Sequence, residues 1–362
     1  MKITNISAIL IIVLILVGCE TSSENNSRLG IPEVGDSGGL LLEKDDNWYQ
    51  VYFSAPDSPS ASTLRGGPDT QLAGAIDHAR ISVDVAMDSL NLWSLRDALL
   101  DAHRRGVAVR VVVESESLDS EEVQDLQEGG LHIVDDRREG LMHHKFAILD
   151  QREVWSGSMN FTVNGAYRSD NNLVRIQSTD LAENYLVEFE EMFIDHQFGM
   201  DSPANTPRPV MDIDGTRVEV YFSPDDGTME RMLELVQDAQ ESIFFMAYSF
   251  TDDDLAAAMI AAHNSGIEVA GVLDKAQALS NTGGEYQNLL ENGIGVRLDG
   301  NPNSMHHKVI IFDGEIVVTG SYNFSKSAKT KNDENTLILH SSEIAEFFFN
   351  EFERVWGNAE HE

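Results

Sequence analysis

Residues 143–160 read HHKFAILDQREVWSGSMN, and residues 306–323 read HHKVIIFDGEIVVTGSYN. Both stretches fit the pattern H-x-K-x4-D-x6-G-S-x-N, with every gap preserved. Six specified residue types that recur across eighteen positions do not arise by chance, so we expect both copies to contribute to one composite site. The residues of the pattern are His143, Lys145, Asp150, Gly157, Ser158 and Asn160 in the first copy, and His306, Lys308, Asp313, Gly320, Ser321 and Asn323 in the second.

The similarity between the two halves of the chain extends beyond this pattern. The run VYFS occurs at residues 51–54 and again at residues 220–223. Gly106 of AHRRGVAVRVV returns as Gly266 of AHNSGIEVAGV. Solenoid repeats have periods of about 20–50 residues, and the period here is far longer. Each half is therefore expected to be one repeat of a duplicated domain.

Strand-like and helix-like segments alternate in each half. The expected strand, helix and strand are residues 81–87, 93–104 and 107–113 in the first half, and residues 243–248, 253–263 and 267–273 in the second. Their apolar periodicity and the glycine that ends each helix support this order. Alternation of this kind indicates crossover connections, which predict a largely parallel sheet with helices on both faces. We predict an α/β sandwich in each half.

The residue types of the repeated pattern suit the cleavage of a phosphodiester. A neutral imidazole can attack phosphorus while a second, protonated imidazole donates its proton to the departing oxygen and later takes one from water. Two lysines, together with Ser158, Asn160, Ser321, Asn323 and backbone N–H groups, can hold the phosphoryl oxygens as negative charge develops. This chemistry requires no metal and no cofactor.

The paired pattern resembles the phospholipase D superfamily, and the resemblance covers most of the chain. It implies two similar α/β repeats related by a pseudo-twofold axis, with a single active site at their interface. It also implies that His143 and His306 act in a two-step mechanism through a phosphohistidine, supported by Lys145 and Lys308. Because both copies lie on one chain, a monomer suffices to build the site.

The same family places a carboxylate downstream of the pattern, where it orients the histidine of the other half. Glu334 occupies this position in the second repeat, but alignment of SDNNLV with NDENTL puts Asn171 there in the first. The carboxylate is thus missing in the first repeat unless the neighbouring Asp170 replaces it. If Glu334 supports His143 as the aspartate of a catalytic triad supports its histidine, His143 is the nucleophile and His306 the general acid and base.

Two further pairs of residues have more than one interpretation. The pattern includes Asp150 and Asp313 among the catalytic candidates, but each ends a short apolar run before another strand-like segment. That position equally favours a hairpin turn that holds the strands. His144 and His307 alternate with the catalytic residues along a strand, so we expect them to face the opposite side and to pack.

The beginning of the chain resembles a bacterial lipoprotein signal. Lys2 precedes an apolar run over residues 6–17, which is shorter than the roughly 20 residues of a membrane-spanning helix. The run ends in Leu-Val-Gly-Cys at residues 16–19, and Cys19 is the only cysteine, so it forms no disulfide within the chain. The resemblance implies lipidation at Cys19 and a place in the bacterial cell envelope, facing the periplasm or exterior, on the outer membrane in a Gram-negative host. A plain secretory signal or an uncleaved anchor remains the alternative.

Composition divides the chain into five expected segments. Residues 20–46 are rich in Ser, Asn, Gly and acidic residues, which is typical of a tether. Three prolines interrupt polar residues between the two halves. The segments are a signal peptide with its lipidation site (1–19), a flexible tether (20–46), repeat 1 (47–198), a linker (199–214) and repeat 2 (215–362).

The net charge bears on the substrate. The chain has 25 Lys and Arg against 61 Asp and Glu, a formal charge of −36. Such a surface repels polyanions, which disfavours nucleic acid, although a small positive pocket is still possible. Lys326, Lys329 and Lys331 form the clearest local basic cluster, which either contacts a phosphate-bearing substrate or belongs to a solvated loop.

Three classes of function fit these observations. The leading hypothesis is a membrane-tethered phospholipase D that hydrolyses a glycerophospholipid to phosphatidic acid and a free head group. Resolution of the same intermediate by an alcohol gives a phosphatidyltransferase of the cardiolipin-synthase type. The second class is a metal-independent nuclease acting on DNA or RNA. The third is a non-catalytic scaffold lipoprotein, which the retention of all twelve pattern residues disfavours.

Overall fold

The computed structural model describes residues 47–360. The predicted signal peptide, the lipidation site Cys19 and the predicted tether lie outside the described residues. Among residues 47–360, no helix is long and apolar enough to cross a membrane.

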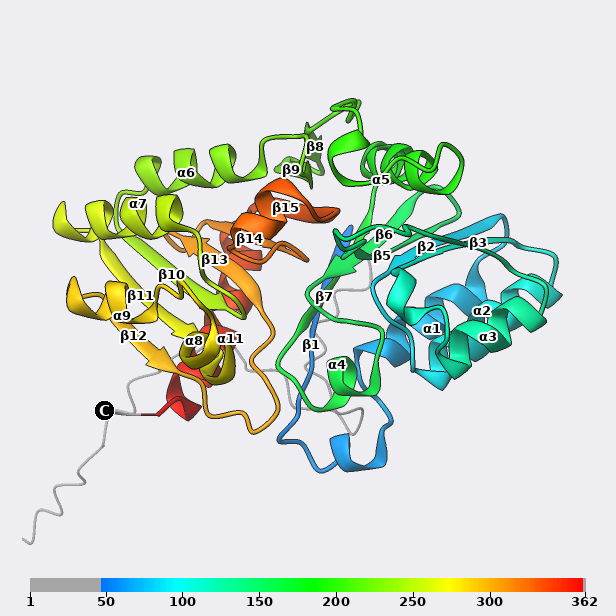
Figure 1. The fold of residues 1–362 in the computed structure, drawn as a ribbon, viewed down its shortest axis with the longest axis horizontal. Helices are drawn as coiled ribbons and strands as arrows, with labels where there is room; N and C mark the ends of the chain where they lie inside the picture. The colour runs from blue at the N-terminus through cyan, green and yellow to red at the C-terminus, as the bar shows by residue number, and fades with distance from the viewer. Residues whose placement is uncertain (1–46, 361–362) are drawn as a thin grey trace, which may run out of the picture. The chain divides into compact units, whose positions relative to one another are not determined.

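The first repeat is built on a seven-stranded sheet with the order β1-β7-β6-β5-β2-β3-β4 (Figure 1). Its elements are β1 (Tyr49–Phe53), η1 (Ala61–Thr63), α1 (Pro68–His78), β2 (Ser82–Met87), α2 (Trp93–Arg104), β3 (Ala108–Val113), η2 (Ser115–Ser117), α3 (Glu121–Glu128), β4 (His132–Asp135), β5 (Lys145–Leu149), β6 (Glu153–Gly157), α4 (Val163–Tyr167), β7 (Asn172–Gln177) and α5 (Thr179–Phe193).

The second repeat has an eight-stranded sheet with the order β12-β11-β10-β13-β14-β15-β9-β8. Its elements are η3 (Gly199–Asp201), β8 (Val210–Ile213), β9 (Thr216–Ser223), α6 (Thr228–Asp238), β10 (Ser242–Ala247), α7 (Asp253–Asn264), β11 (Glu268–Leu273), α8 (Lys275–Ser280), α9 (Tyr286–Glu291), β12 (Gly295–Leu298), β13 (Lys308–Phe312), β14 (Ile316–Gly320), α10 (Lys326–Thr330), β15 (Glu334–His340) and α11 (Ser342–Asn358). Strand β8 falls within the segment expected as a linker and pairs with β9 at the edge of this sheet.

The prediction of a largely parallel sheet was wrong. Only β2-β3-β4 and β10-β11-β12 pair in parallel, and all other neighbouring strands are antiparallel. Helices α2 and α3 connect the parallel strands of the first repeat and α7, α8 and α9 those of the second, whereas β5 and β6, and likewise β13 and β14, are joined by tight turns. A short turn can connect only antiparallel strands.

The predicted fold of two similar α/β repeats is confirmed. In the first repeat, α1, α2 and α3 pack on one face of the sheet (Figure 1), and α5 packs on the other. The core on the α5 side is continuous with the core on the α11 side of the second repeat. Tyr185 of α5 contacts Phe222 of β9 with ring centroids 5.1 Å apart, and Phe53 of β1 contacts Phe348 of α11 at 5.2 Å. These apolar contacts fix the two sheets relative to each other, and the segments that carry His143 and His306 lie at the boundary between them.

Several carboxyl groups are buried around this boundary. Burial is the main cause that raises the pKa of Glu114, Glu191, Asp225 and Asp333, in each case to about 7. A carboxyl whose pKa rises on folding stabilises the protein below its ordinary pKa, and this contribution is lost as the pH rises through the folded value. Between pH 4 and pH 7, roughly, the folded protein therefore binds more protons than the unfolded chain.

We expect the protein to be more stable at pH 6.5 than at pH 8. The pKa values of His144 and His306 are lowered, mainly by burial, and these two groups act in the opposite direction below their ordinary pKa. Between pH 6.5 and pH 8 the four carboxyls outweigh the two imidazoles. The free energy of unfolding is expected to be about 1 kcal/mol higher at pH 6.5 than at pH 8, after allowance for solvent screening. Denaturant unfolding at the two pH values measures it; equal stability, or greater stability at pH 8, would contradict this account.

Candidate active site

The two histidines lie in short segments that precede β5 and β13, and each segment is held by the other repeat. The backbone N–H of His143 donates to the carbonyl of Asp333 at 3.0 Å, and that of His306 donates to the carbonyl of Asp170 at 2.9 Å. Isolated bridges join Met142 to Asp333 and Met305 to Asp170. The pattern residues His143 and His306 are thus brought to one site, which neither repeat forms alone.

Each histidine ring is oriented by a side chain from the opposite repeat. The Nδ1 atom of His143 lies 2.7 Å from Oε2 of Glu334, which is fully buried. The Nδ1–H of His306 donates to Oδ1 of Asn171 at 2.9 Å and to the carbonyl of Ser158 at 3.1 Å. Since these partners are acceptors, Nδ1 carries the proton and Nε2 is left for chemistry.

The predicted alternative, Asp170, does not contact the ring of His306. Its carboxylate pairs with Arg354 and accepts a hydrogen bond from Asn301. The orientation of Asn171 is set independently, because its Nδ2 donates to the carbonyl of Gly165 at 3.0 Å. The support of the two histidines is therefore unequal, with a carboxylate behind one and a carboxamide behind the other.

The two lysines of the pattern are almost completely buried. Lys145 Nζ donates to the carbonyl of His143 at 2.6 Å, and Lys308 Nζ donates to that of His306 at 2.8 Å. Burial lowers the pKa of both lysines, and the charge of Lys145 lowers that of Lys308 further. Burial and the charges of Lys308, Lys145 and His143 likewise hold the pKa of His306 well below its ordinary value. The site thus concentrates positive charge where an anion can offset it.

The serine, asparagine and glycine residues of the pattern shape the site. Ser158 Oγ donates to Oδ1 of Asn171 at 2.9 Å, so this serine supports the partner of His306. A Cβ atom at Gly157 would lie 2.4 Å from the carbonyl oxygen of Asn172, which explains the glycine. Ser321 accepts the backbone N–H of Asn335 at 3.0 Å. The asparagines of the pattern are Asn160 and Asn323. Their Oδ1 atoms are buried and accept no hydrogen bond from the described residues.

Asp150 and Asp313 do not join the histidines and lysines. They follow β5 and β13, at the far ends of these strands from the histidines, with φ values of 51° and 53°. Oδ1 of Asp150 accepts the backbone N–H of Ile81 at 2.6 Å, and Oδ1 of Asp313 accepts that of Glu241 at 2.7 Å. Of the two interpretations made from the sequence, these contacts support the structural one.

Asp150→Ala and Asp313→Ala are therefore expected to lower stability and not catalysis. Each substitution leaves backbone N–H groups at the start of β2 or β10 without their acceptor, at a cost of about 1–3 kcal/mol. Thermal unfolding and kcat, measured on the same preparations below the melting temperature, separate the two roles. A loss of kcat of a hundredfold or more in a variant that is still folded would restore the catalytic interpretation.

His144 and His307 face away from the lysines, as their alternation predicts, and each forms a buried hydrogen bond with a glutamate. His144 Nε2 lies 2.9 Å from Glu188, and His307 Nε2 lies 3.0 Å from Glu351. Their Nδ1 atoms face the carboxamides of Asn335 and Asn172, respectively, across the repeat boundary.

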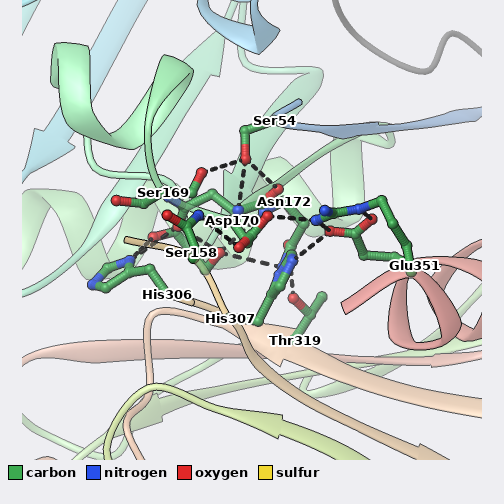
Figure 2. Close-up of polar contacts among 12 residues, drawn as sticks. Ser54, Ser158, Ser169, Asp170, Asn172, His306, His307, Thr319 and Glu351 are labelled. Carbon is green, nitrogen blue, oxygen red and sulfur yellow. Dashed lines mark hydrogen bonds and ion pairs between the residues drawn. The ribbon is translucent and has the colours of Figure 1, made fainter. Parts of the chain in front are cut away.

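Figure 2 shows how these contacts continue into the active site around His306. From His306 the polar contacts pass through Asn171 and Ser158 to Asn172 and His307. They continue through Glu351 to Arg354 and Asp170, whose carbonyl accepts the N–H of His306. The sequence pattern did not indicate Arg354. Asn172 and Asn335 could have been found, since each follows the serine of its copy by 14 residues.

The predicted basic cluster after the second G-S-x-N is not uniformly free. Lys329 Nζ lies 3.4 Å from Asp254 and 4.0 Å from Glu230, whereas Lys326 and Lys331 are exposed. The pairing of Lys329 and the exposure of the other two lysines support a solvated surface segment, but Lys326 and Lys329 lie in the short helix α10 and not in a loop.

A known protein family matches both repeats. The family described as "Cardiolipin synthase, PLD-like domain" matches residues 72–193 and 232–356, and so covers parts of both repeats. The chain belongs to this phospholipase D-like family.

Curated relatives match the phospholipase D-like chain over about the length of one repeat. It is 30% identical over 151 residues to a phospholipase D of Rickettsia bellii (strain RML369-C), a match that covers 40% of this chain and 75% of the relative. It is 29% identical over 140 residues to a mitochondrial cardiolipin hydrolase of Chlamydomonas reinhardtii, covering 39% of this chain and 62% of that protein. These relations make the protein a phosphodiesterase of the phospholipase D type.

The two-repeat arrangement is found in a solved structure. A phosphatidylserine synthase from Haemophilus influenzae Rd KW20 superposes with a TM-score of 0.64, covering 90% of this phospholipase D-like chain and 89% of that chain. The sequence identity is 14%, so this likeness concerns the fold alone.

Proposed function

We propose that the protein is a membrane-tethered phospholipase D that hydrolyses glycerophospholipids to phosphatidic acid and a free head group, with His143 as the nucleophile. The observation that carries the assignment of the nucleophile is the 2.7 Å contact between His143 Nδ1 and the buried carboxylate of Glu334. A phosphorylated imidazole is positively charged, and a carboxylate at this distance stabilises it. His306 has only the carboxamide of Asn171 at the same place.

In the first step, the Nε2 lone pair of His143 forms a bond to phosphorus and the bond from phosphorus to the head-group oxygen breaks. His306 donates its Nε2 proton to that departing oxygen. In the second step, His306 takes a proton from water, the water oxygen bonds to phosphorus, and the bond from phosphorus to His143 breaks. Lys145 and Lys308 offset the negative charge of the phosphoryl oxygens throughout.

His306 must be protonated to act as the acid in the first step, although its pKa is low in the free protein. Burial and the charges of Lys308, Lys145 and His143 produce that low value. A bound phosphodiester carries a negative charge that offsets these cations, which raises the pKa of His306 in the complex. The substrate thus prepares its own general acid.

The lipid substrate is supported by two observations. The relatives that match bear the names phospholipase D and mitochondrial cardiolipin hydrolase. The formal charge of −36 opposes the approach of a nucleic acid. The description of the family as cardiolipin synthase favours a second candidate, a phosphatidyltransferase in which an alcohol takes the place of water in the second step.

The membrane tether and the location in a bacterial cell envelope belong to the same proposal. They rest on the apolar run at residues 6–17 and on Cys19, all outside the described residues. Cys19→Ser is expected to release the protein from the membrane fraction of a bacterial host, whereas the unchanged chain stays with it. Equal membrane retention of both would remove the lipid anchor from the proposal.

The substrate is tested by incubating the protein, in EDTA, with mixed phospholipid vesicles and separately with single- and double-stranded DNA. His143→Ala serves as the inactive variant, and His78→Ala, an exposed histidine on α1, as its matched control. Release of head group and phosphatidic acid that is lost only in His143→Ala supports the proposal. Added glycerol that diverts the product to a phosphatidyl alcohol identifies the transferase. Cleavage of DNA alone would overturn the lipid assignment.

A further inference from the structure

The residue five positions before each catalytic histidine contacts the other repeat. This residue is Arg138 in the first copy and Asn301 in the second. The spacing to the histidine is the same in both copies, although the residue types differ and the repeated pattern begins only at the histidine. The two positions are therefore equivalent in the duplicated fold, and their contacts can be compared directly.

Arg138 joins two segments that belong to different repeats. Its Nη1 donates to the carbonyl of Lys331 at 2.5 Å. Its Nη2 donates to the carbonyl of Leu141 at 3.1 Å and to the carboxylate of Asp333. Leu141 lies two residues before the catalytic histidine of the first repeat, and Asp333 directly precedes the glutamate that orients this histidine. One guanidinium thus holds the segment that carries the histidine to the segment that carries its supporting carboxylate.

Asn301 makes the corresponding contacts from the second repeat to the first. Its Nδ2 donates to the carbonyl of Arg168 at 3.1 Å and to the carboxylate of Asp170 at 2.8 Å. These two acceptors align with Lys331 and Asp333 of the second repeat. Two donors of different chemistry, a guanidinium and a carboxamide, therefore reach the equivalent carbonyl and the equivalent carboxylate across the repeat boundary.

The backbone pairing that these side chains reinforce is a bridge and not a strand ladder. Asp333 donates its N–H to the carbonyl of Leu141 at 2.9 Å and accepts the N–H of His143 at 3.0 Å. Successive side chains of an extended segment point to opposite sides, so Glu334 faces the histidine ring while Asp333 faces Arg138. A shift of Asp333 would carry Glu334 away from the ring.

We propose that Arg138 and Asn301 are positioning residues, each of which holds one catalytic histidine against the side chain that orients it from the opposite repeat. Arg138 sets the contact between His143 and Glu334. Asn301 sets the corresponding contact of His306. The inference rests on the proposed function for the step that each histidine performs, but the positioning itself does not depend on the substrate.

The two residues are expected to affect different steps of the reaction with a nitrophenyl phosphodiester. Misplacement of a reacting group by about 1 Å costs about a hundredfold in rate. Arg138→Ala should slow the release of the first equivalent of nitrophenol by about this factor, with little change in KM and no burst. Asn301→Ala should release the first equivalent as fast as the unchanged enzyme and then turn over slowly, because nitrophenol needs no acid but the second step needs a base.

Arg138→Lys guards against an unfolded variant. The lysine keeps a positive charge beside Asp333, but a single ammonium does not reproduce the fork with which the guanidinium reaches two carbonyls and a carboxylate. An intermediate loss of kcat is therefore expected.

NMR of the full-length protein in detergent, labelled with ¹⁵N-histidine, tests the positioning without any turnover. The Nδ1–H resonance of His143, which is identified by its absence in His143→Ala, reports the 2.7 Å contact with Glu334. Arg138→Ala and Arg138→Lys should shift this resonance upfield and leave that of His306 in place. Asn301→Ala should do the reverse. A general loss of stability would not select one ring over the other.

Arg104→Ala, on the exposed surface of α2, is the matched control for the removal of a guanidinium and should leave both resonances and kcat unchanged. Unchanged ring resonances in Arg138→Lys and Asn301→Ala would overturn the inference, as would equal effects of each variant on both rings. If the resonances respond as expected but the unchanged enzyme cleaves no phosphodiester, the proposed function fails and the positioning role stands.

Discussion

His143→Ala is expected to lower kcat for phosphodiester hydrolysis by about 10⁵-fold, because the substitution removes the atom that forms the covalent intermediate. His306→Ala should behave differently toward a substrate with a nitrophenol leaving group. Such a leaving group needs no proton, so the first step proceeds, whereas the second step lacks its base. A burst of about one equivalent of nitrophenol, followed by slow turnover, is therefore expected for His306→Ala and no burst for His143→Ala.

Stopped-flow absorbance at the nitrophenolate band measures this burst. His78→Ala, which changes an exposed histidine, is the matched control and should turn over like the unchanged enzyme, without slowing after the first equivalent. A burst that appears in His143→Ala and is missing in His306→Ala would exchange the roles of the two histidines. The absence of a burst in both, with both enzymes folded, would leave no support for a covalent intermediate.

Glu334→Gln is expected to lower kcat by about 10³-fold or more. The substitution keeps the size of the side chain but removes the charge that lies 2.7 Å from His143 Nδ1. In a catalytic triad, replacing the carboxylate by an amide favours the wrong tautomer of the histidine. Here the substitution would in addition remove the negative charge that stabilises the phosphorylated, positively charged ring of His143. Steady-state kinetics on one substrate provides the value, since KM should change little.

The chain offers a matched comparison at the equivalent position of the other repeat. Asn171→Asp adds a carboxylate 2.9 Å from His306 Nδ1, and we expect a change in kcat of less than about tenfold, because His306 forms no covalent bond. Equal losses in Glu334→Gln and Asn171→Asp would show that the two sides are equivalent. That result would contradict the assignment of the nucleophile from Glu334.

The sequence predicted that His143 and His306 come to one site and that Glu334 contacts His143, because the duplication compares the chain with itself. Residues that recur at the same spacing in both halves, such as His143 and His306, stand out without any other sequence. The same comparison showed that the first repeat has Asn171 where the second has Glu334. In the structure, Glu334 contacts His143 and Asn171 contacts His306.

The duplication also explains what the sequence did not reveal. Arg138 and Asn301 share a position but not a residue type, so a search for repeated residues passes over them. Arg354 contacts the site through Asp170 and Glu351 by packing of α11, which no spacing rule indicates. The strand directions were predicted wrongly because the alternation of strands and helices was taken to continue through each repeat. After β4 it gives way to antiparallel strands, such as β5 and β6, which the turn at Asp150 connects.

The central claim is that a phosphoryl group is carried on His143. Its most direct test is to quench the reaction of His306→Ala with a radiolabelled phosphodiester at alkaline pH, where phosphohistidine survives, and to map the label by peptide mass spectrometry. The account predicts one label, on the peptide that contains His143. A label on any other residue, or turnover without any labelled protein, would contradict it.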